Sequence, residues 1–271
     1  MRCGLTGKIL SMKFLVKKNH RYIYNYVILS RGRSGSTYLA ERIGSQPEFL
    51  GFQEIFTSEH VCSLYCQKNL QNECLHYINY KDFTFDEYYS ILTDHMKILN
   101  KEKISQKVLF NHLDENPGLA DFLISRSKFI HLSRNPFYEA VSGAYALSNQ
   151  FWNSTNDAME AYRKELHFSK TYLEPQRILD EISYSQHWNK FFFEKFSVFA
   201  DQYLAVSYEK LFNNDQIQAD TLMRFLGLKE PIHFTNSKHS IINYKKQIEN
   251  WEELVSIVGK SEFASLLYPT F

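Results

Sequence analysis

The sequence has no strong excess of charge of either sign. Its 271 residues include 31 lysines and arginines and 30 aspartates and glutamates, which gives a formal net charge of +1. Nucleic-acid-binding surfaces, and surfaces attracted generally to anionic membranes, need an excess of basic residues. The composition therefore argues against a nucleic-acid partner. In addition, no apolar run approaches the roughly 20 residues that a transmembrane helix needs.

Proline, glycine and cysteine are scarce as well. The chain contains 6 prolines and 10 glycines, and no stretch is enriched in them as a linker between domains would be. With 44% hydrophobic residues, residues 1–271 can bury a single core, so we expect one domain. The cysteines are Cys3, Cys62, Cys66 and Cys74. Their spacing matches no common zinc site, so we expect free thiols in a cytoplasmic protein.

The N-terminal residues 1–21 combine scattered basic residues with short apolar groups. A signal peptide would need a longer apolar core and small residues at a cleavage site. We therefore interpret the segment as a basic lead-in to the domain. The alternative interpretation is a short amphipathic segment that makes peripheral contact with a membrane.

The most informative pattern lies between Tyr26 and Tyr38, in the stretch YVILSRGRSGSTY. The apolar run VIL is typical of a strand buried on both faces of a parallel sheet. The loop Ser30–Ser36 contains only serine, arginine and glycine, and apolar residues at helical spacing begin after Thr37. A strand, a small basic loop and a helix N-terminus, in that order, form a site for a phosphate or a similar anion.

The loop differs from the Walker motif G-x-x-x-x-G-K-[ST] in an informative way. If Gly35 is aligned with the second glycine of that motif, Ser30 replaces the first glycine and Ser36 replaces the lysine. The lysine that contacts the β- and γ-phosphates of a nucleotide is therefore missing. Arg33 is present instead, and its paired donors can bind a phosphate or a sulfate.

A second basic loop follows about a hundred residues later, by direct count along the sequence. Phe129–Leu132 has the pattern of another buried strand, and Arg134 lies at its carboxyl end. Asn135 and Pro136 then predict a helix start, and Ser142 lies eight positions after the arginine. Because ligands of open parallel sheets bind beyond the carboxyl ends of the strands, both loops should face one crevice.

These two stretches resemble the cofactor motifs of sulfotransferases that use 3′-phosphoadenosine 5′-phosphosulfate (PAPS). The first family motif, R-S-G-S-T after a buried strand, is present at Arg33–Thr37. The second is an arginine at a strand end with a serine eight positions later, matched by Arg134 and Ser142. The resemblance implies an α/β fold, a P-loop-like three-layer sandwich with a parallel central sheet and helical insertions.

The resemblance also assigns roles to these residues. The residues implied to hold the 5′-phosphosulfate are Arg33, Ser34, Gly35, Ser36 and Thr37. Arg134 and Ser142 are implied to hold the 3′-phosphate, the group that distinguishes PAPS from ATP. No metal is demanded, because arginine and the loop amides can neutralise the charge that magnesium neutralises in kinases.

Transfer to a hydroxyl group also needs a base near the acceptor oxygen. Glu54 follows the predicted strand Phe49–Phe52, and the G-x-x-E spacing from Gly51 loosely resembles the base element of bacterial carbohydrate sulfotransferases. His112, directly after the predicted strand Lys107–Asn111, is the alternative base. A surface glutamate and a structural histidine are the non-catalytic interpretations of the same two residues.

The remaining segments carry weaker signals. We expect residues 57–105, which show no sustained period, and residues 149–175, which are largely polar and aromatic, to be insertions or acceptor-side segments. The sequence further predicts a strand at Tyr203–Val206. The predicted helices lie at Phe85–Leu99, Pro117–Ile124 and Ile178–Phe199, with an amphipathic C-terminal helix between Ile248 and Val258.

Two C-terminal features bear on the family branch. Tyr208-Glu209-Lys210-Leu211 resembles the Tyr-Glu-x-Leu element that ends a core strand in sulfotransferases. In the family a basic segment near the C-terminus closes over the cofactor, and Lys238 is the candidate for that contact. The R-K-G element of the animal cytosolic branch is absent from this sequence. That absence favours the bacterial carbohydrate or lipopolysaccharide branch.

The sequence thus predicts a PAPS-dependent sulfotransferase that modifies a hydroxyl group of a carbohydrate or of a lipid-linked glycan. Two other classes stay open. A nucleotide-dependent kinase would need the Walker lysine, and Ser36 stands at that position. A non-catalytic nucleotide- or glycan-binding member would need no base at Glu54 or His112.

Overall fold

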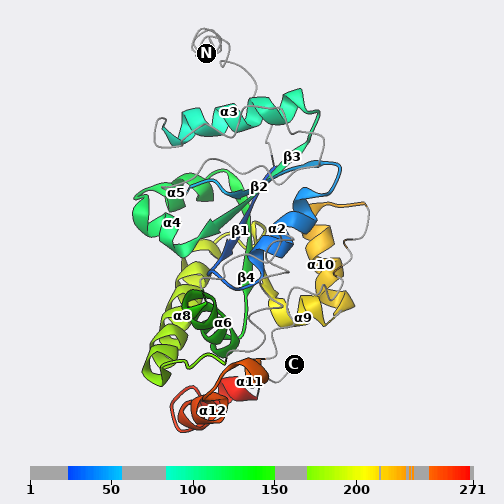
Figure 1. The fold of residues 1–271 in the computed structure, drawn as a ribbon. Coiled ribbons are helices and arrows are strands. Elements are labelled where there is room, and N and C mark those ends of the chain that lie inside the picture. Colours follow the sequence, from blue (N-terminus) through cyan, green and yellow to red (C-terminus); the bar gives the residue numbers. More distant parts are fainter. Residues whose placement is uncertain are drawn as a thin grey trace, which may run out of the picture.

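A computed structural model of the protein describes residues 24–56, 84–149, 170–213, 215–229 and 244–268, together with Ile232 and Phe234. Within these residues, five parallel strands form one sheet in the order β2-β3-β1-β4-β5 (Figure 1). The strands are β1 (Tyr24–Ser30), β2 (Phe49–Glu54), β3 (Lys103–Leu109), β4 (Ser127–Ser133) and β5 (Tyr203–Ser207). This arrangement confirms the predicted α/β class with a parallel central sheet.

Helices connect the strands and cover the sheet. They are α2 (Ser36–Gly44), α3 (Phe85–Ile98), α4 (Phe110–Glu115), α5 (Leu119–Ile124), α6 (Pro136–Ser148), α8 (Pro175–Phe196), α9 (Tyr208–Phe212), α10 (Gln216–Leu226), α11 (Tyr244–Gln247) and α12 (Trp251–Gly259), followed by the 3-10 turn η4 (Ala264–Leu267). In this described part of the chain, no helix has the length and apolar composition needed to cross a membrane. The predicted lead-in at 1–21, the four cysteines and Lys238 lie outside the described residues.

The central strand β1 explains why the fold has three layers. Successive side chains of a strand point to opposite faces of the sheet. Val27 and Leu29 pack into one hydrophobic cluster with residues of α3, α5 and α8, whereas Tyr26 and Ile28 pack into another with residues of α2, α9 and α10. Because both faces of β1 are covered by helices, the apolar run seen in the sequence has no polar alternation.

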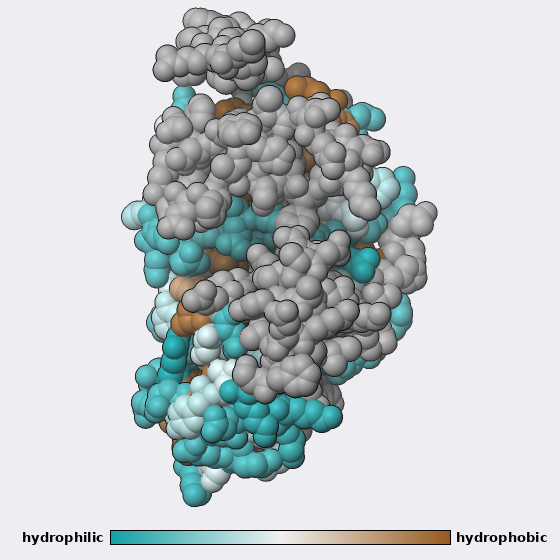
Figure 2. Space-filling view, viewed as in Figure 1, coloured by the Kyte–Doolittle hydropathy of each residue, from teal (hydrophilic) through white to brown (hydrophobic). Residues whose placement is uncertain are grey.

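A third hydrophobic cluster lies beside the sheet, between α6, α8 and the C-terminal elements. Leu254 and Val258 of α12 are buried in it, which confirms the predicted amphipathic helix near the C-terminus. The outer surface of this end of the molecule, at the bottom of Figure 2, is mostly hydrophilic. The C-terminal helices are therefore held by their inward apolar faces against α6 and α8.

Helix α2 and strand β2 approach each other through two glycines. A Cβ atom built on Gly51 would lie 2.5 Å from the Cα of Gly44, and one built on Gly44 would lie 3.0 Å from the Cα of Gly51. Any larger residue at Gly51 would thus collide with the helix backbone. The pair brings the strand that ends at Glu54 into close contact with the helix that follows the anion-binding loop.

The sequence misplaced one strand. We expected a strand at Lys107–Asn111, but β3 runs from Lys103 to Leu109, and His112 lies within α4 instead of directly after the strand. The N-terminal part of β3 has no apolar run because Ser105 and Gln106 are polar although they are buried. The Gln106 amide nitrogen is nevertheless paired inside the core, where it donates a 3.2 Å hydrogen bond to the Asn25 side chain.

Candidate active site

The anion-binding loop, residues 31–35, connects β1 to α2 at the carboxyl edge of the sheet. Arg33 and Gly35 have left-handed backbone conformations, with φ angles of 68° and 87°. The Ser34 hydroxyl donates a 2.8 Å hydrogen bond to the carbonyl oxygen of Arg31. Gly35 is the N-cap of α2 and has no side chain that could bind the first amide groups of the helix. The loop backbone is thus shaped to accept an anion.

Tyr208, the first residue of α9, holds this loop and the second basic loop together. A Cβ atom at Gly35 would lie 2.5 Å from the Tyr208 ring, so only glycine fits there. The guanidinium carbon of Arg134 lies 4.6 Å from the centroid of the same ring, a cation–π contact. The next residue, Glu209, accepts a 2.8 Å hydrogen bond from the backbone amide of Asn135. The Tyr-Glu-x-Leu element therefore supports both basic loops.

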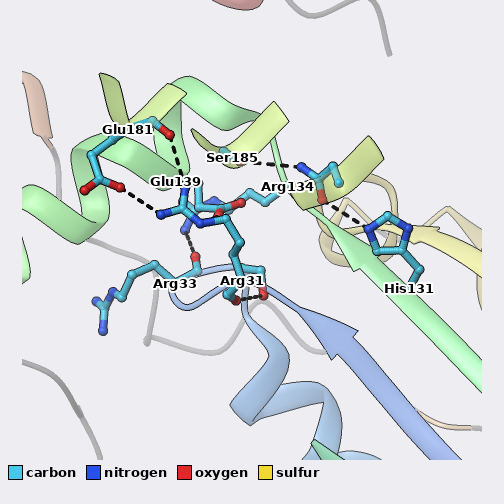
Figure 3. Close-up of polar contacts among 9 residues, drawn as sticks. Arg31, Arg33, His131, Arg134, Glu139, Glu181 and Ser185 are labelled. Atoms are coloured by element: carbon cyan, nitrogen blue, oxygen red, sulfur yellow. Dashed lines mark hydrogen bonds and ion pairs between the residues drawn. The ribbon is translucent and has the colours of Figure 1, made fainter. Parts of the chain in front are cut away.

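The two sequence motifs meet at Arg33. Its Nε donates a 3.2 Å hydrogen bond to the hydroxyl oxygen of Ser142 in α6. Arg134 Nη1 donates a 2.8 Å hydrogen bond to the backbone carbonyl oxygen of Arg33 (Figure 3). Asn135 begins α6 by accepting a 2.9 Å hydrogen bond from the amide of Phe137, so the chain turns directly after Arg134. The structure therefore brings together Arg33, Arg134 and Ser142.

The electrostatics of this cluster favour an anionic ligand. Burial lowers the pKa of Arg33, Tyr244 opposes that effect, and the positive charge of Arg134 lowers the pKa further. The Nε atom of Arg134 is buried without a hydrogen-bond partner. Two neighbouring cations and a buried donor without an acceptor are stabilised by a negative group placed between them. The residues present therefore fit the phosphate groups of a nucleotide such as PAPS.

The two candidate bases lie in a second cluster at the same edge of the sheet. Glu54, the last residue of β2, is paired with Lys107 of β3 at a distance of 2.6 Å between Oε1 and Nζ. Its other oxygen, Oε2, lies 3.5 Å from Nε2 of His112. Lys107 Nζ also donates a 2.9 Å hydrogen bond to the Thr37 hydroxyl in the first turn of α2. Lys107 thus connects the glutamate to the end of the anion-binding loop.

Neighbouring groups set the pKa of Glu54 and the position of the hydrogen on a neutral His112 ring. Burial alone would raise the pKa of Glu54, but hydrogen bonds and charge from His112 and Lys107 outweigh it and lower that pKa to about 2. The His112 ring accepts a 3.2 Å hydrogen bond at Nδ1 from the backbone amide of Leu109. A neutral ring must then carry its hydrogen on Nε2, which faces Glu54. In that tautomer His112 presents its Nε2 hydrogen to the carboxylate of Glu54.

Three residues with clear structural roles were missed from the sequence. Lys107 is 5% exposed and Arg31 is 9% exposed, and each is directed at carboxylate oxygens. Glu139 of α6 is 3% exposed. Each of these charged residues lies inside or beside a predicted buried element. Because Lys, Arg and Glu are rarely buried without a partner, this position in the sequence could have indicated a buried ion pair. The partners themselves could not be found without the order of the strands.

Lys238, the residue predicted to contact the cofactor from the C-terminal part of the chain, lies outside the described residues, and its role stays a prediction. Tyr244 of α11, a described residue of the C-terminal part, interacts electrostatically with Arg33. Its ring centroid lies 6.2 Å from that of Tyr145 in α6.

The described residues contain no group of three or more His, Cys, Asp and Glu side chains that could hold a metal ion.

Comparison with solved structures gave sulfotransferases. The chain is similar to a sulfotransferase from Alicyclobacillus acidocaldarius, with 16% identity, coverage of 90% of this chain and 92% of that chain, and a TM-score of 0.46. The sulfotransferase domain of the Synechococcus PCC 7002 olefin synthase gives 15% identity, coverage of 94% and 91%, and a TM-score of 0.44. A mouse sulfotransferase complexed with PAP gives 16% identity, coverage of 92% and 68%, and a TM-score of 0.38. No curated protein matches the chain in sequence.

The sequence model of a protein family, described as the sulfotransferase family, matches residues 26–231. The matched region starts at β1 and extends beyond α10. It includes the anion-binding loop, the Arg134 loop, Glu54 and the Tyr-Glu-x-Leu element. The chain therefore belongs to the sulfotransferase family, whose enzymes transfer a sulfuryl group.

Proposed function

We propose that this enzyme takes its sulfuryl group from PAPS and transfers it to a hydroxyl group of a carbohydrate or a lipid-linked glycan. The observation that carries the choice of donor is the contact of Arg33 with both Ser142 and Arg134. A donor with a 5′-phosphosulfate and a 3′-phosphate carries two separate anionic groups. Two neighbouring basic loops, joined by these contacts, suit such a molecule.

Each loop would hold one of these groups. Arg33 and the amides and hydroxyls of Ser34–Thr37 would bind the 5′-phosphosulfate at the N-terminus of α2. Arg134 and Ser142 would bind the 3′-phosphate. Bound PAPS supplies the sulfuryl group, and Arg33 would stabilise the negative charge that develops on the 5′-phosphate side. The Arg33–Ser142 hydrogen bond would then be exchanged for hydrogen bonds to the ligand.

Glu54 would accept the proton of the acceptor hydroxyl. Its low pKa keeps it ionised at neutral pH but makes it a weak base. An anion bound at the loop would compete with Glu54 for the charge of Lys107, which contacts both Glu54 and Thr37. When the attraction between a carboxylate and a neighbouring lysine weakens, the pKa of the carboxylate rises. Donor binding would therefore strengthen the base next to it.

The acceptor class is supported by the sequence. The spacing from Gly51 to Glu54 loosely resembles the base element of bacterial carbohydrate sulfotransferases, and the R-K-G element of the other branch is absent. Transfer of labelled sulfate to a panel of glycans, glycolipids and phenols tests this part. Labelling of phenols, with the glycans and glycolipids left unlabelled, would reject the carbohydrate branch.

Calorimetric titration tests the donor directly. The protein is titrated with adenosine 3′,5′-bisphosphate, ATP and ADP in the absence of added metal. We expect clear binding of the bisphosphate and weaker binding of the other two, because only the bisphosphate carries a group for Arg134 and Ser142. Magnesium-dependent binding of ATP without bisphosphate binding would reject the proposal and indicate a kinase.

A further inference from the structure

Arg31 is the first residue of the anion-binding loop, and its side chain is occupied by the protein. Nη2 donates a 2.7 Å hydrogen bond to Oε2 of Glu181 in α8, and Nη1 donates a 3.1 Å hydrogen bond to the backbone carbonyl of the same residue. Figure 3 shows the Arg31 side chain directed at Glu181, whereas the Arg33 side chain leaves the loop in another direction. The two arginines of the loop therefore have different tasks.

Other elements hold the same guanidinium group. Its carbon lies 5.0 Å from the ring centroid of Tyr184 in α8 and 5.6 Å from that of Phe110 in α4. Its Nε lies 3.5 Å from Oε1 of the buried Glu139 in α6. With residues of α4, α6 and α8 around it, Arg31 fixes the start of the loop to three helices at once.

The loop is attached to α6 at two positions, one helical turn apart. Arg31 faces Glu139, and Arg33 binds Ser142, three residues further along the helix. Residues three apart lie on the same face of a helix. In the proposed function Arg33 and Ser142 exchange their mutual hydrogen bond for bonds to the donor. The contacts of Arg31 then remain as the attachment of the loop.

We propose that Arg31 is a positioning residue, which holds the loop against α6 and α8 so that Arg33 and the N-terminus of α2 stay aligned with Arg134 when the donor binds. This inference rests on the proposed function. The competing idea is that Arg31 is itself a ligand of the donor and merely rests on Glu181. When Glu181 loses its charge, the two ideas predict changes of opposite sign in the affinity for the donor nucleotide.

The experiment compares Glu181→Gln and Arg31→Lys with the unaltered protein by calorimetric titration with adenosine 3′,5′-bisphosphate. Glu181→Gln removes a negative charge near an anion site, so electrostatics alone, or a freed Arg31 ligand, would tighten binding. If Arg31 positions the loop, affinity falls instead, by about three- to tenfold, because small misplacements of binding groups are costly. Arg31→Lys keeps the charge but loses the paired donors, so affinity falls as well.

Glu194→Gln is the matched control. Glu194 lies on the same helix, its side chain is 63% exposed, and its pairing partner is Lys190 of that helix. The same chemical change there leaves the affinity within twofold of the unaltered protein, roughly the scatter expected for a surface substitution. Unchanged or tighter binding by Glu181→Gln would overturn the positioning role.

A second measurement does not depend on the donor. Amide hydrogen exchange of residues 31–36 is followed without nucleotide in the three variants and the unaltered protein. Faster exchange in Glu181→Gln and Arg31→Lys, but not in Glu194→Gln, supports the inference, and equal exchange in all four proteins overturns it. If the unaltered protein does not bind the bisphosphate, the proposed function fails, while the exchange result still decides whether Arg31 holds the loop.

Discussion

Arg33 donates a 3.2 Å hydrogen bond to Ser142, although the two residues are 109 positions apart in the sequence. Each belongs to one of the two motifs, so the contact joins the loop after β1 to the helix after β4. The arrangement places the groups expected to bind the two ends of the donor next to each other. The predictions below separate their contributions.

Removal of the Arg134 side chain should weaken the binding of nucleotides that carry a 3′-phosphate more than that of nucleotides without one, although Arg134 also holds the loop through the Arg33 carbonyl. Arg134→Ala is expected to weaken binding of adenosine 3′,5′-bisphosphate by about 10- to 100-fold, because a charge-assisted hydrogen bond is lost. Binding of adenosine 5′-phosphate should change far less. Both are measured by calorimetry, with Arg126→Ala as the control, since Arg126 forms an exposed pair with Asp86. Equal losses for both nucleotides would remove the 3′-phosphate role.

The charge of Glu54 should matter for turnover and little for donor binding. Glu54→Gln is expected to reduce kcat by about 100-fold or more, since a carboxamide cannot accept the proton. Bisphosphate affinity should not fall, and it should rise slightly because the carboxylate charge that competes for Lys107 is removed. Glu48→Gln, just before β2, is the control. Full activity of Glu54→Gln would transfer the base role to His112.

Lys107 should determine the pH below which kcat/KM falls. In the free enzyme the pKa of Glu54 is held at about 2 by His112 and Lys107 against the opposing effect of burial. Glu54 therefore loses its charge only below about pH 4. Lys107→Met removes part of the lowering, so an acid limb of kcat/KM should appear between about pH 4 and 6. The profile is recorded only where circular dichroism shows a folded protein, and an unshifted limb contradicts the assignment.

Replacement of Gly35 by alanine should reduce the stability of the protein more than replacement of Gly118, a glycine with the same backbone conformation. Gly118 has a φ of 88° with no heavy atom within 4 Å of a built Cβ, whereas the Cβ at Gly35, with a φ of 87°, meets the Tyr208 ring. Gly118→Ala should cost about 1–2 kcal/mol of unfolding free energy from the left-handed conformation alone. Gly35→Ala should cost more, because the ring must also move. Urea titrations measure the unfolding free energies of both variants. Equal losses would show that the Tyr208 ring moves aside without a cost in stability.

Glu139 should make the protein less stable as the pH rises. Burial raises the pKa of Glu139 to about 7, although Arg31, Arg134 and Ser185 oppose the effect. A folded-state pKa above the unfolded value contributes stability that is full below about pH 4 and is lost as the pH approaches 7. Gln cannot ionise, so Glu139→Gln should gain about 2–3 kcal/mol relative to the unaltered protein between pH 5 and 8.

Urea titrations at several pH values measure this difference. Glu194→Gln, an exposed position on α8, should show no such trend with pH. A Glu139→Gln difference that stays constant between pH 5 and 8 would mean that the carboxyl ionises in the folded protein as it does in water.

Local patterns were enough to predict most of the sheet and the positions of the two basic loops at the strand ends. The apolar runs of β1 and β4, the Asn135 cap and the basic loops are properties of consecutive residues. β3 was misplaced because it contains buried polar residues such as Gln106, whose partner Asn25 lies on the neighbouring strand β1. The placement of Glu54, Lys107 and Thr37 in one cluster depends on β3 lying between β2 and β1. Strand order is set by packing of the whole domain, which no local pattern records.

The contact of Gly44 with Gly51 has a consequence for the chemistry. Where two side chains separate a helix from a strand, rotamer changes can alter their spacing by fractions of an ångström. Here the backbones of α2 and β2 meet directly, so their separation has a hard lower limit that no side-chain motion changes. The separation between the helix that begins after the loop and the strand that ends at Glu54 is therefore limited by main-chain contact at Gly44 and Gly51.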